Sequence, residues 1–247
     1  MILLEDTRQQ AGKHKAKHKW FQEHGIHVNR TMLVCGDYQL PGRGDVAVDT
    51  KFSISELIGD VQIKAMTKKD IEKAVNELYA KNHISGDANR IYRIITDDDS
   101  DRFAEKEISD FCFENRISEE VMKEFQKLYV KRHGFFHRGL VRAKNYGVKL
   151  YVLVENEDGV DGIDSLFRWV NPRSKYTVST GRVIGRLPNG RLKYQRVPKY
   201  PNCMKGEQLA KACLTMQLKY GCTFVFCKPH EAAEKIVELL EGKHENV

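Results

Sequence analysis

Two aspartates and a lysine stand at a spacing that could support phosphodiester hydrolysis. Asp37 follows a glycine, and Asp49 and Lys51 end a β-rich run over residues 46–51. Residues i and i+2 of a strand point to the same side of a sheet, so Asp49 and Lys51 would face one site, which Asp37 can reach from the neighbouring strand. Carboxylates are the hard oxygen ligands that Mg²⁺ and Mn²⁺ prefer, and the Thr50 carbonyl would be a third ligand. The pattern predicts a divalent-metal site.

A lysine beside such a metal can take part in the reaction directly. Lys51 could orient the attacking water, help to deprotonate it and offset charge that builds on the phosphate. Two plainer interpretations stay open. Asp37 could be a turn residue, since aspartate favours turns, and Asp49 with Lys51 could be an ion pair on an exposed edge strand.

Positive charge is concentrated in one stretch of the sequence. The chain carries 41 Lys and Arg against 34 Asp and Glu, a formal net charge of +7. Residues 172–200 hold eight cations and no acid, whereas residues 97–120 are acidic, and the lysines of residues 13–19 form a second basic cluster. Cations gain free energy by displacing condensed counterions from a polyphosphate, and the tyrosines of residues 172–200 could stack on bases. The predicted DNA contacts in that stretch are Arg182, Arg186, Arg191 and Lys193.

The apolar pattern predicts a mixed α/β protein in which most of the chain is ordered. Strands are expected at 2–4, 27–34, 38–40, 46–51, 149–155 and 223–226, and helices at about 10–24, 54–61, 135–147, 163–170, 207–220 and 231–240. Ser53 could cap its helix with Glu56 as the capping-box partner. An Asn-Gly turn predicts a β-hairpin with strands at 183–187 and 191–197.

The core motif resembles the XPF-type nuclease domain of structure-specific DNA endonucleases, which belongs to the PD-(D/E)XK superfamily. The matching segment is GDYQLPGRGDVAVDTKFSISELIGDV; residues 5–9 resemble the family's first strand, and the segment from His137 through KLYVLVE resembles its later helix and central strand. The resemblance covers residues 1–61 and 133–170. It departs from the family in three ways: D-T-K replaces E-R-K, the spacing between the aspartates is slightly longer, and no tandem helix-hairpin-helix module follows.

The resemblance implies a restriction-endonuclease-like core: a mixed sheet flanked by helices. We expect one nuclease domain over residues 1–247, with a helical, acidic insertion at about 62–132 and a basic hairpin insertion at about 172–205. By position, Asp37 and Asp49 would be metal ligands and Lys51 the catalytic lysine.

The resemblance also implies roles for residues outside the core motif. Asp6 would be a further acid, either a ligand or a water-orienting group, although it could instead cap the first helix. Arg8, Arg138 and Arg142 would contact DNA phosphates, although the last two could be solvated helix cations. Glu155, at the end of its strand, could support the ligands from behind.

These features predict a Mg²⁺- or Mn²⁺-dependent DNA endonuclease. It would cut flapped, forked or branched DNA in repair, recombination or phage DNA metabolism, as a homodimer or with a protein partner. A DNA-binding partner subunit with a dead site and a nuclease for structured RNA remain alternatives. No apolar run approaches the roughly 18 residues that span a bilayer. The chain turns acidic soon after Met1 and has no C-x-x-C pair, so we expect an intracellular protein without a membrane partner.

Overall fold

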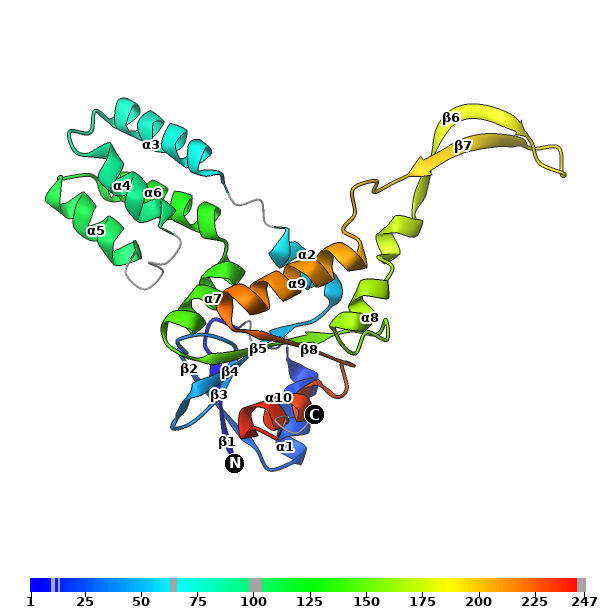
Figure 1. Ribbon diagram of the computed structural model, residues 1–247, viewed down its shortest axis with the longest axis horizontal. Helices are drawn as coiled ribbons and strands as arrows, with labels where there is room; N and C mark the ends of the chain where they lie inside the picture. The colour runs from blue at the N-terminus through cyan, green and yellow to red at the C-terminus, as the bar shows by residue number, and fades with distance from the viewer. Residues whose placement is uncertain (10–11, 13, 63–65, 98–103, 244–247) are drawn as a thin grey trace.

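A six-stranded mixed sheet forms the centre of the protein (Figure 1). The computed structural model describes residues 1–9, 12, 14–62, 66–97 and 104–243. The strand order is β2 (His27–Thr31), β1 (Ile2–Asp6), β3 (Tyr38–Leu40), β4 (Arg43–Lys51), β5 (Lys149–Glu155) and β8 (Thr223–Cys227). Strand β3 runs antiparallel to both of its neighbours, and the remaining pairings in the sheet are parallel. The expected mixed sheet is confirmed.

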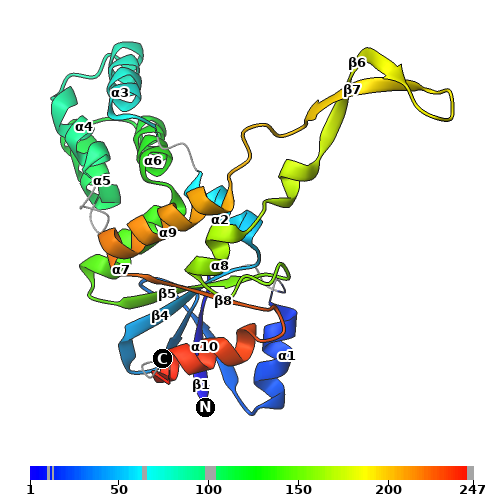
Figure 2. The same ribbon diagram turned by 45° about the vertical axis from the view of Figure 1, so that its right-hand side comes forward.

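The central strands are apolar because helices cover both faces of the sheet. Six of the seven residues of β5 are buried, with only Lys149 exposed, as expected for a parallel strand buried on both sides. One face is covered by α2 (Ile54–Val61), α7 (Phe135–Asn145), α8 (Ile163–Arg168) and α9 (Gly206–Tyr220), and the other by α1 (Lys15–Glu23) and α10 (Ala232–Glu241) (Figure 2). The sheet therefore has a separate apolar core on each face.

Alternation along β4 divides its side chains between these two cores. Ala47 packs in the core under α2 and α7, whereas Val46 and Val48 pack in the core under α1 and α10. Asp49 and Lys51 continue the first series, so they project on the α2 and α7 side. The parallel pairing with β5, Asp49 opposite Val152, fixes this register.

Four helices between α2 and α7 form a body of their own. They are α3 (Lys68–Asn82), α4 (Ala88–Thr96), α5 (Ala104–Glu114) and α6 (Glu119–His133). Their buried side chains, including Ile71, Ile91 and Phe125, make a third core that is separate from the two cores of the sheet. The backbone N–H of Met66 donates to the Lys131 carbonyl at 3.1 Å, so the chain enters and leaves this body at one place.

A β-hairpin projects from the opposite side of the molecule (Figure 1). After the short helix η1 (Pro172–Lys175), strands β6 (Thr177–Arg186) and β7 (Leu192–Pro198) pair only with each other. The turn closes with a Leu187 N–H to Arg191 carbonyl bond of 2.8 Å and a left-handed Gly190. We call residues 177–198 the arm. The hairpin is confirmed, and its first strand begins earlier than the expected residue 183.

Several element ends differ from expectation. The first described helical residue is Lys15, and residues 10, 11 and 13 of the expected helix lie outside the described residues. Strand β2 ends at Thr31 rather than at residue 34. Ser53 caps α2 as predicted, but the Glu56 carboxylate accepts from the Phe52 N–H rather than the Ser53 N–H.

All six cysteines are free thiols, five of them buried, which agrees with the absence of paired spacing in the sequence. No helix among the described residues is both long and apolar enough to cross a bilayer.

Candidate active site

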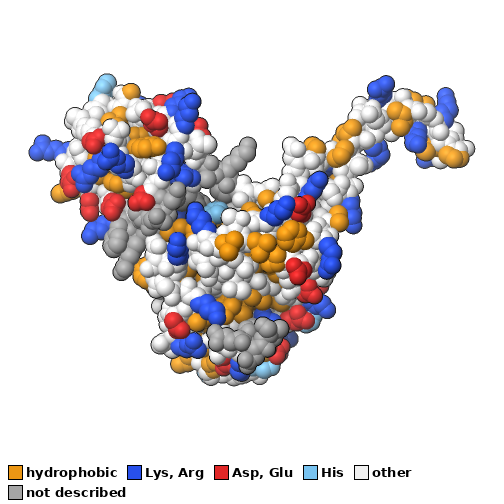
Figure 3. Space-filling model, in the orientation of Figure 1, with side chains coloured by type: hydrophobic (Ala, Val, Ile, Leu, Met, Phe, Trp, Pro, Cys, Tyr) orange, Lys and Arg blue, Asp and Glu red, His pale blue; other side chains and the backbone are white. Residues whose placement is uncertain are grey.

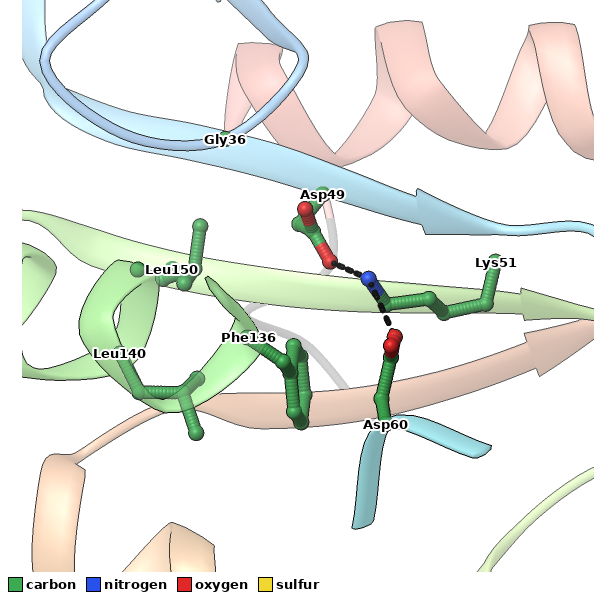
Figure 4. A pocket seen from close by; sticks show the side chains of 8 residues that line it. Gly36, Asp49, Lys51, Asp60, Phe136, Leu140 and Leu150 are labelled. Atoms are coloured by element: carbon green, nitrogen blue, oxygen red, sulfur yellow. Dashed lines mark ion pairs between the residues drawn. The ribbon is translucent and has the colours of Figure 1, made fainter. Parts of the chain in front are cut away.

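The end of β4 opens into a small charged pocket (Figure 4). The pocket has a volume of about 160 Å³ and lies between β4, β5, α2 and α7. The side chains that shape it are Asp49, Lys51, Asp60, Phe136, Leu140 and Leu150. Three ionisable groups therefore share a pocket whose other walls are apolar, an environment in which charge–charge interactions are stronger than in water.

Lys51 is held between two carboxylates. Its Nζ lies 2.8 Å from Asp49 Oδ2 and 3.0 Å from Asp60 Oδ2, and 4.5 Å from the centre of the Phe136 ring. Burial acts to lower the pKa of Lys51, but the two carboxylates outweigh it and raise the pKa above the ordinary lysine value. Lys51 is therefore an ammonium at neutral pH and has no free lone pair with which to accept a proton.

Asp37 is buried at the start of β3, behind this pocket. Thr50 donates twice to its Oδ2, from the backbone N–H at 2.8 Å and from Oγ1 at 2.6 Å, and Gln9 Nε2 donates to its Oδ1. Burial and the negative charge of Asp49 nevertheless raise the pKa of Asp37 to about 7. Gly36, directly before it, has a φ of 70°, and a Cβ there would lie 3.0 Å from the Val48 carbonyl oxygen.

Asp49 is the less satisfied of the two carboxylates. Its Oδ2 is buried and has no hydrogen-bond partner of good geometry, despite its ion pair with Lys51. Burial raises the pKa of Asp49 above the ordinary aspartate value. Two neighbouring carboxylates whose pKa values are both raised are a favourable setting for a cation.

The donor set fits a hard divalent cation that keeps part of its water shell. Within the described residues no group of three or more His, Cys, Asp or Glu side chains is placed to hold a metal. Asp37 and Asp49 supply two carboxylates, and the Thr50 carbonyl lies between Asp49 and Lys51 in sequence. Magnesium is commonly held by one or two carboxylates together with waters and substrate phosphates, so this limited set suits it.

Asp6 is occupied by other groups. Its carboxylate accepts from the Arg8 backbone N–H at 2.7 Å, from the Arg8 guanidinium and from the Leu33 N–H at 3.2 Å. Burial acts to raise its pKa, but these hydrogen bonds lower the pKa below the ordinary value. Asp6 does not cap α1, whose N-cap is His14. Asp6 therefore fixes the position of Arg8. The negative charge of Asp37 also helps to raise the pKa of the Arg8 guanidinium.

A buried polar chain supports Asp37 from the α1 side. Gln9 Oε1 contacts His14 Nε2 at 2.7 Å, and His14 Nδ1 lies 3.4 Å from Lys17 Nζ. Lys17 in turn forms a buried ion pair with Glu155. The run of lysines at 13–19 suggests an exposed basic cluster, but Lys17 is buried and does not belong to one. Glu155 is linked to Asp37 only through Lys17, His14 and Gln9 in this chain of contacts.

The two arginines of α7 are not solvated helix cations. Arg138 is buried, with its guanidinium 5.0 Å from the centre of the Tyr129 ring of α6. Arg142 is half-buried, and its Nη1 donates to the Val34 carbonyl at 3.1 Å. Arg138 joins the two helices at the edge of the helical body, whereas Arg142 reaches the loop that leads to Asp37.

The arm, which carries the remaining predicted DNA contacts, projects away from the sheet and β4 (Figure 1). Arg182, Arg186, Arg191 and Lys193 are all exposed. The structure does not bring them together with Asp37, Asp49 and Lys51. The space-filling view shows the arm carrying blue and orange side chains and no red (Figure 3).

Sequence reasoning missed Asp60, Gln9 and Lys17. Asp60 lies on α2, one turn after the buried Leu57, and faces Lys51 because the helix folds back over β4. The sequence held no signal for this contact, because it depends on how α2 packs against the sheet. Lys17 gave no signal, because its neighbours in the sequence, Lys15 and Lys19, are also lysines.

Comparison with known proteins does not identify a family for the chain. No family model matches the chain, and no curated protein matches it. Solved structures similar to the chain include XPF from Aeropyrum pernix, with 12% identity and a TM-score of 0.39 over all of this chain. The match covers 66% of that structure, so the chain spans slightly less than two thirds of its length. A likeness this remote does not assign the chain to a family.

Proposed function

We propose that the protein is a metal-dependent endonuclease that hydrolyses phosphodiester bonds in DNA. The observation that carries the proposal is the end of β4, where Asp49 contacts the ammonium of Lys51 and the buried carboxyl of Asp37 is hydrogen-bonded to Thr50 between them. When bound, Mg²⁺ or Mn²⁺ would supply Lewis-acid activation of the phosphate and of the attacking water. Asp37, Asp49 and the Thr50 carbonyl would hold the cation.

Lys51 would act as a cation in this reaction. Since its pKa is raised, it enters the reaction protonated and can donate a hydrogen bond to a phosphate oxygen on which negative charge grows. This role differs from the proton acceptor that the sequence pattern alone allowed. Asp60 would aim the Lys51 ammonium without touching the substrate, and Arg8, fixed by Asp6, would meet a neighbouring phosphate.

A polyphosphate fits the charge distribution, and we take DNA as the proposed substrate. Within the part of the chain that the structure describes, the arm presents cations without any acid, as expected of a surface that meets phosphates. A role on flapped, forked or branched DNA in repair, recombination or phage DNA metabolism belongs to this proposal, as does assembly with a second copy or a partner. Structured RNA offers the same phosphates and is separated by experiment.

A cleavage assay tests the proposal. End-labelled duplex, flap, fork and single-stranded DNA, with matched RNA flaps, are incubated with Mg²⁺, Mn²⁺ or EDTA. We expect metal-dependent cutting of DNA that Asp49→Asn and Lys51→Met each abolish. The matched control is Asp45→Asn, an exposed aspartate on the same strand whose partner is Arg43; it should cut like the wild type.

Other outcomes would redirect the proposal. Binding of these DNAs without cutting by any variant would identify a DNA-binding subunit with an inactive site. Cutting of the RNA flap in preference to the DNA flap would change the substrate class and leave the chemistry intact. Cutting that persists in EDTA, or in Asp49→Asn, would exclude the proposed metal site.

A further inference from the structure

The arm is a protein surface without a protein partner in the described structure. Every residue of β6 is exposed, and in β7 only Gln195 and Val197 are half-buried. Among the residues that the structure describes, β6 and β7 pair with no other strand. An isolated two-stranded ribbon is marginally stable in water, so a chain that keeps one with ten exposed residues in a single strand presents it to something.

The cations of the arm differ from those on the rest of the surface. Within the described residues, none of Arg182, Arg186, Arg191 and Lys193 forms an ion pair, and residues 172–200 contain no acid that could supply one. The exposed lysines elsewhere that are paired with an acid include Lys19, Lys73, Lys123 and Lys211. The arm therefore keeps its positive charge uncompensated, which favours a polyanion as its occupant.

Apolar side chains lie among these cations. Val183 is opposite Tyr194 in the ribbon, and they are 48% and 43% exposed. The turn presents Leu187, 41% exposed, next to the exposed Pro188. Apolar wedges of this kind, carried on a cationic element, are used by proteins that insert between base pairs from the minor groove.

The backbone of the arm is curved. The ladder shifts register between Ser179 and Val183 and again between Val183 and Gly185, and Gly181 has a φ of 78°. Bulges of this kind bend a ribbon and increase its twist, and Figure 1 shows the arm curving towards its tip. The ten residues of β6 reach roughly 30 Å at about 3.3 Å per residue, close to one turn of duplex DNA.

The two chain segments at the root of the arm are fastened to each other. The Tyr176 and Tyr200 rings meet edge to face with centres 6.4 Å apart, and Arg173 lies 5.8 Å from the Tyr200 ring centre. The Lys199 N–H donates to the Tyr176 carbonyl at 2.8 Å. Tyr176 and Tyr200 thus stabilise the root of the arm. Of the three tyrosines in residues 172–200, only Tyr194 lies on the ribbon itself.

We propose that the arm lies in the minor groove of duplex DNA and that Leu187 and Pro188 insert between base pairs and bend the duplex. The arm cations then contact phosphates on both sides of the groove. The inference rests on the proposed function and makes it more specific. It names a double-stranded segment next to the cut as the part of the substrate that the arm holds. The binding step itself needs neither metal nor cleavage.

Binding and bending are measured in EDTA, where cleavage cannot interfere. Anisotropy on a 30-base-pair duplex at several salt concentrations gives affinity and its salt slope, and energy transfer between dyes at the duplex ends gives the bend. The arm charge variant is Arg182→Gln, Arg186→Gln, Arg191→Gln and Lys193→Gln. The wedge variant is Leu187→Ser with Pro188→Ser, and the matched control is Lys19→Gln, Lys73→Gln, Lys123→Gln and Lys211→Gln.

The two variants are expected to fail in different ways. The charge variant should lower the salt slope by about 3 to 4, because each phosphate that is no longer neutralised by a cation reduces the slope by close to one unit. The wedge variant should keep the slope and lose the bend. The control should match the wild type in both readouts. Because the arm contributes nothing to the cores of the sheet, the charge and wedge variants are expected to melt like the wild type. The control lysines are exposed, so the control is expected to melt close to the wild type as well.

Two results would overturn the inference. One is a charge variant or wedge variant that binds and bends duplex DNA like the wild type. The other concerns a loop variant in which a short glycine turn between Tyr176 and Lys199 replaces residues 177–198. If the wild type is a dimer and this variant is a monomer with unchanged DNA binding, the arm joins two copies of the chain instead. Failure of the proposed function is separate, since it means no cutting with metal whatever the arm does.

Discussion

At the scale of single residues, the site is defined by three ionisable groups whose pKa values are shifted from the ordinary ones. Asp37 and Asp49 are carboxylates whose pKa values are raised by burial, and Lys51 is a lysine whose pKa is raised by two acids. Strongly shifted pKa values gathered at and behind a pocket are typical of functional sites. Asp60 completes the pocket without being a candidate ligand.

Replacing Asp60 should weaken catalysis without weakening DNA binding. Asp60→Asn leaves Lys51 with Asp49 alone, so its ammonium loses one of the two groups that aim it. We expect kcat to fall by about 10- to 100-fold, as for other residues that orient a reacting group, while KM changes little. Single-turnover cleavage measures this, with Asp45→Asn as the control. A rise in KM at constant kcat would contradict the aiming role.

The buried charge of Asp37 should make stability depend on pH. Its pKa is about 7 in the folded protein against 3.8 as the ordinary value, so the folded state binds more protons between these pH values. The free energy of unfolding therefore loses the Asp37 contribution as pH rises from about 4 to about 7. Urea denaturation in EDTA should show wild type losing stability relative to Asp37→Asn across this range. Parallel curves for the two proteins would refute it.

At the scale of elements, strand alternation explains what could be read from the sequence. The i, i+2 rule gave Asp49 and Lys51 a common side, and the structure places both in one pocket. Asp60 and Lys17 could not be found in this way, because their positions depend on how α2 and α1 pack on the sheet. Packing angles are set by side chains distant in sequence, such as Phe21 and Ile236 for α1.

The ion pair between Lys17 and Glu155 fastens α1 to β5. Both side chains are almost fully buried, at 4% and 6% exposure. Lys17→Met should therefore destabilise the protein by roughly 3–5 kcal/mol, because it leaves a buried carboxylate without its partner. Lys17→Met with Glu155→Leu should recover much of this loss. Chemical denaturation gives the values.

An exposed pair on the same helix is the matched control for this prediction. Lys19→Gln removes the partner of Glu23, and both of those side chains are exposed. We expect a change within about 0.5 kcal/mol. Equal losses from Lys17→Met and Lys19→Gln would show that burial does not set the energy of the Lys17 pair.

At the scale of the whole molecule, the helical body (α3 to α6) and the arm project from different sides of the sheet and its two helical layers (Figures 1 and 2). The sequence predicted both from composition: acidic and helical for one, basic with an Asn-Gly turn for the other. It could not predict that the helices would build a core of their own, since Ile71, Ile91 and Phe125 have the same apolar character as residues of the main core.

The helical body should be removable. Replacing residues 67–130 with a short flexible linker between Met66 and Lys131 should leave the sheet and its helices folded, because the removed core is separate. Arg138 would lose the Tyr129 ring, so some loss of stability at the start of α7 is expected. Circular dichroism and thermal melting measure this. A chain that no longer melts cooperatively would show that the helices are needed for the fold.

The hydrogen bond between Met66 and Lys131 has a practical meaning beyond this excision. It makes the two ends of the helical body an insertion point, where a foreign domain with neighbouring termini can be spliced in without stretching the sheet. A fluorescent protein inserted there would lie on the side of the molecule opposite the arm. Paired with a dye on the duplex, it would report in real time how the nucleic acid approaches and leaves.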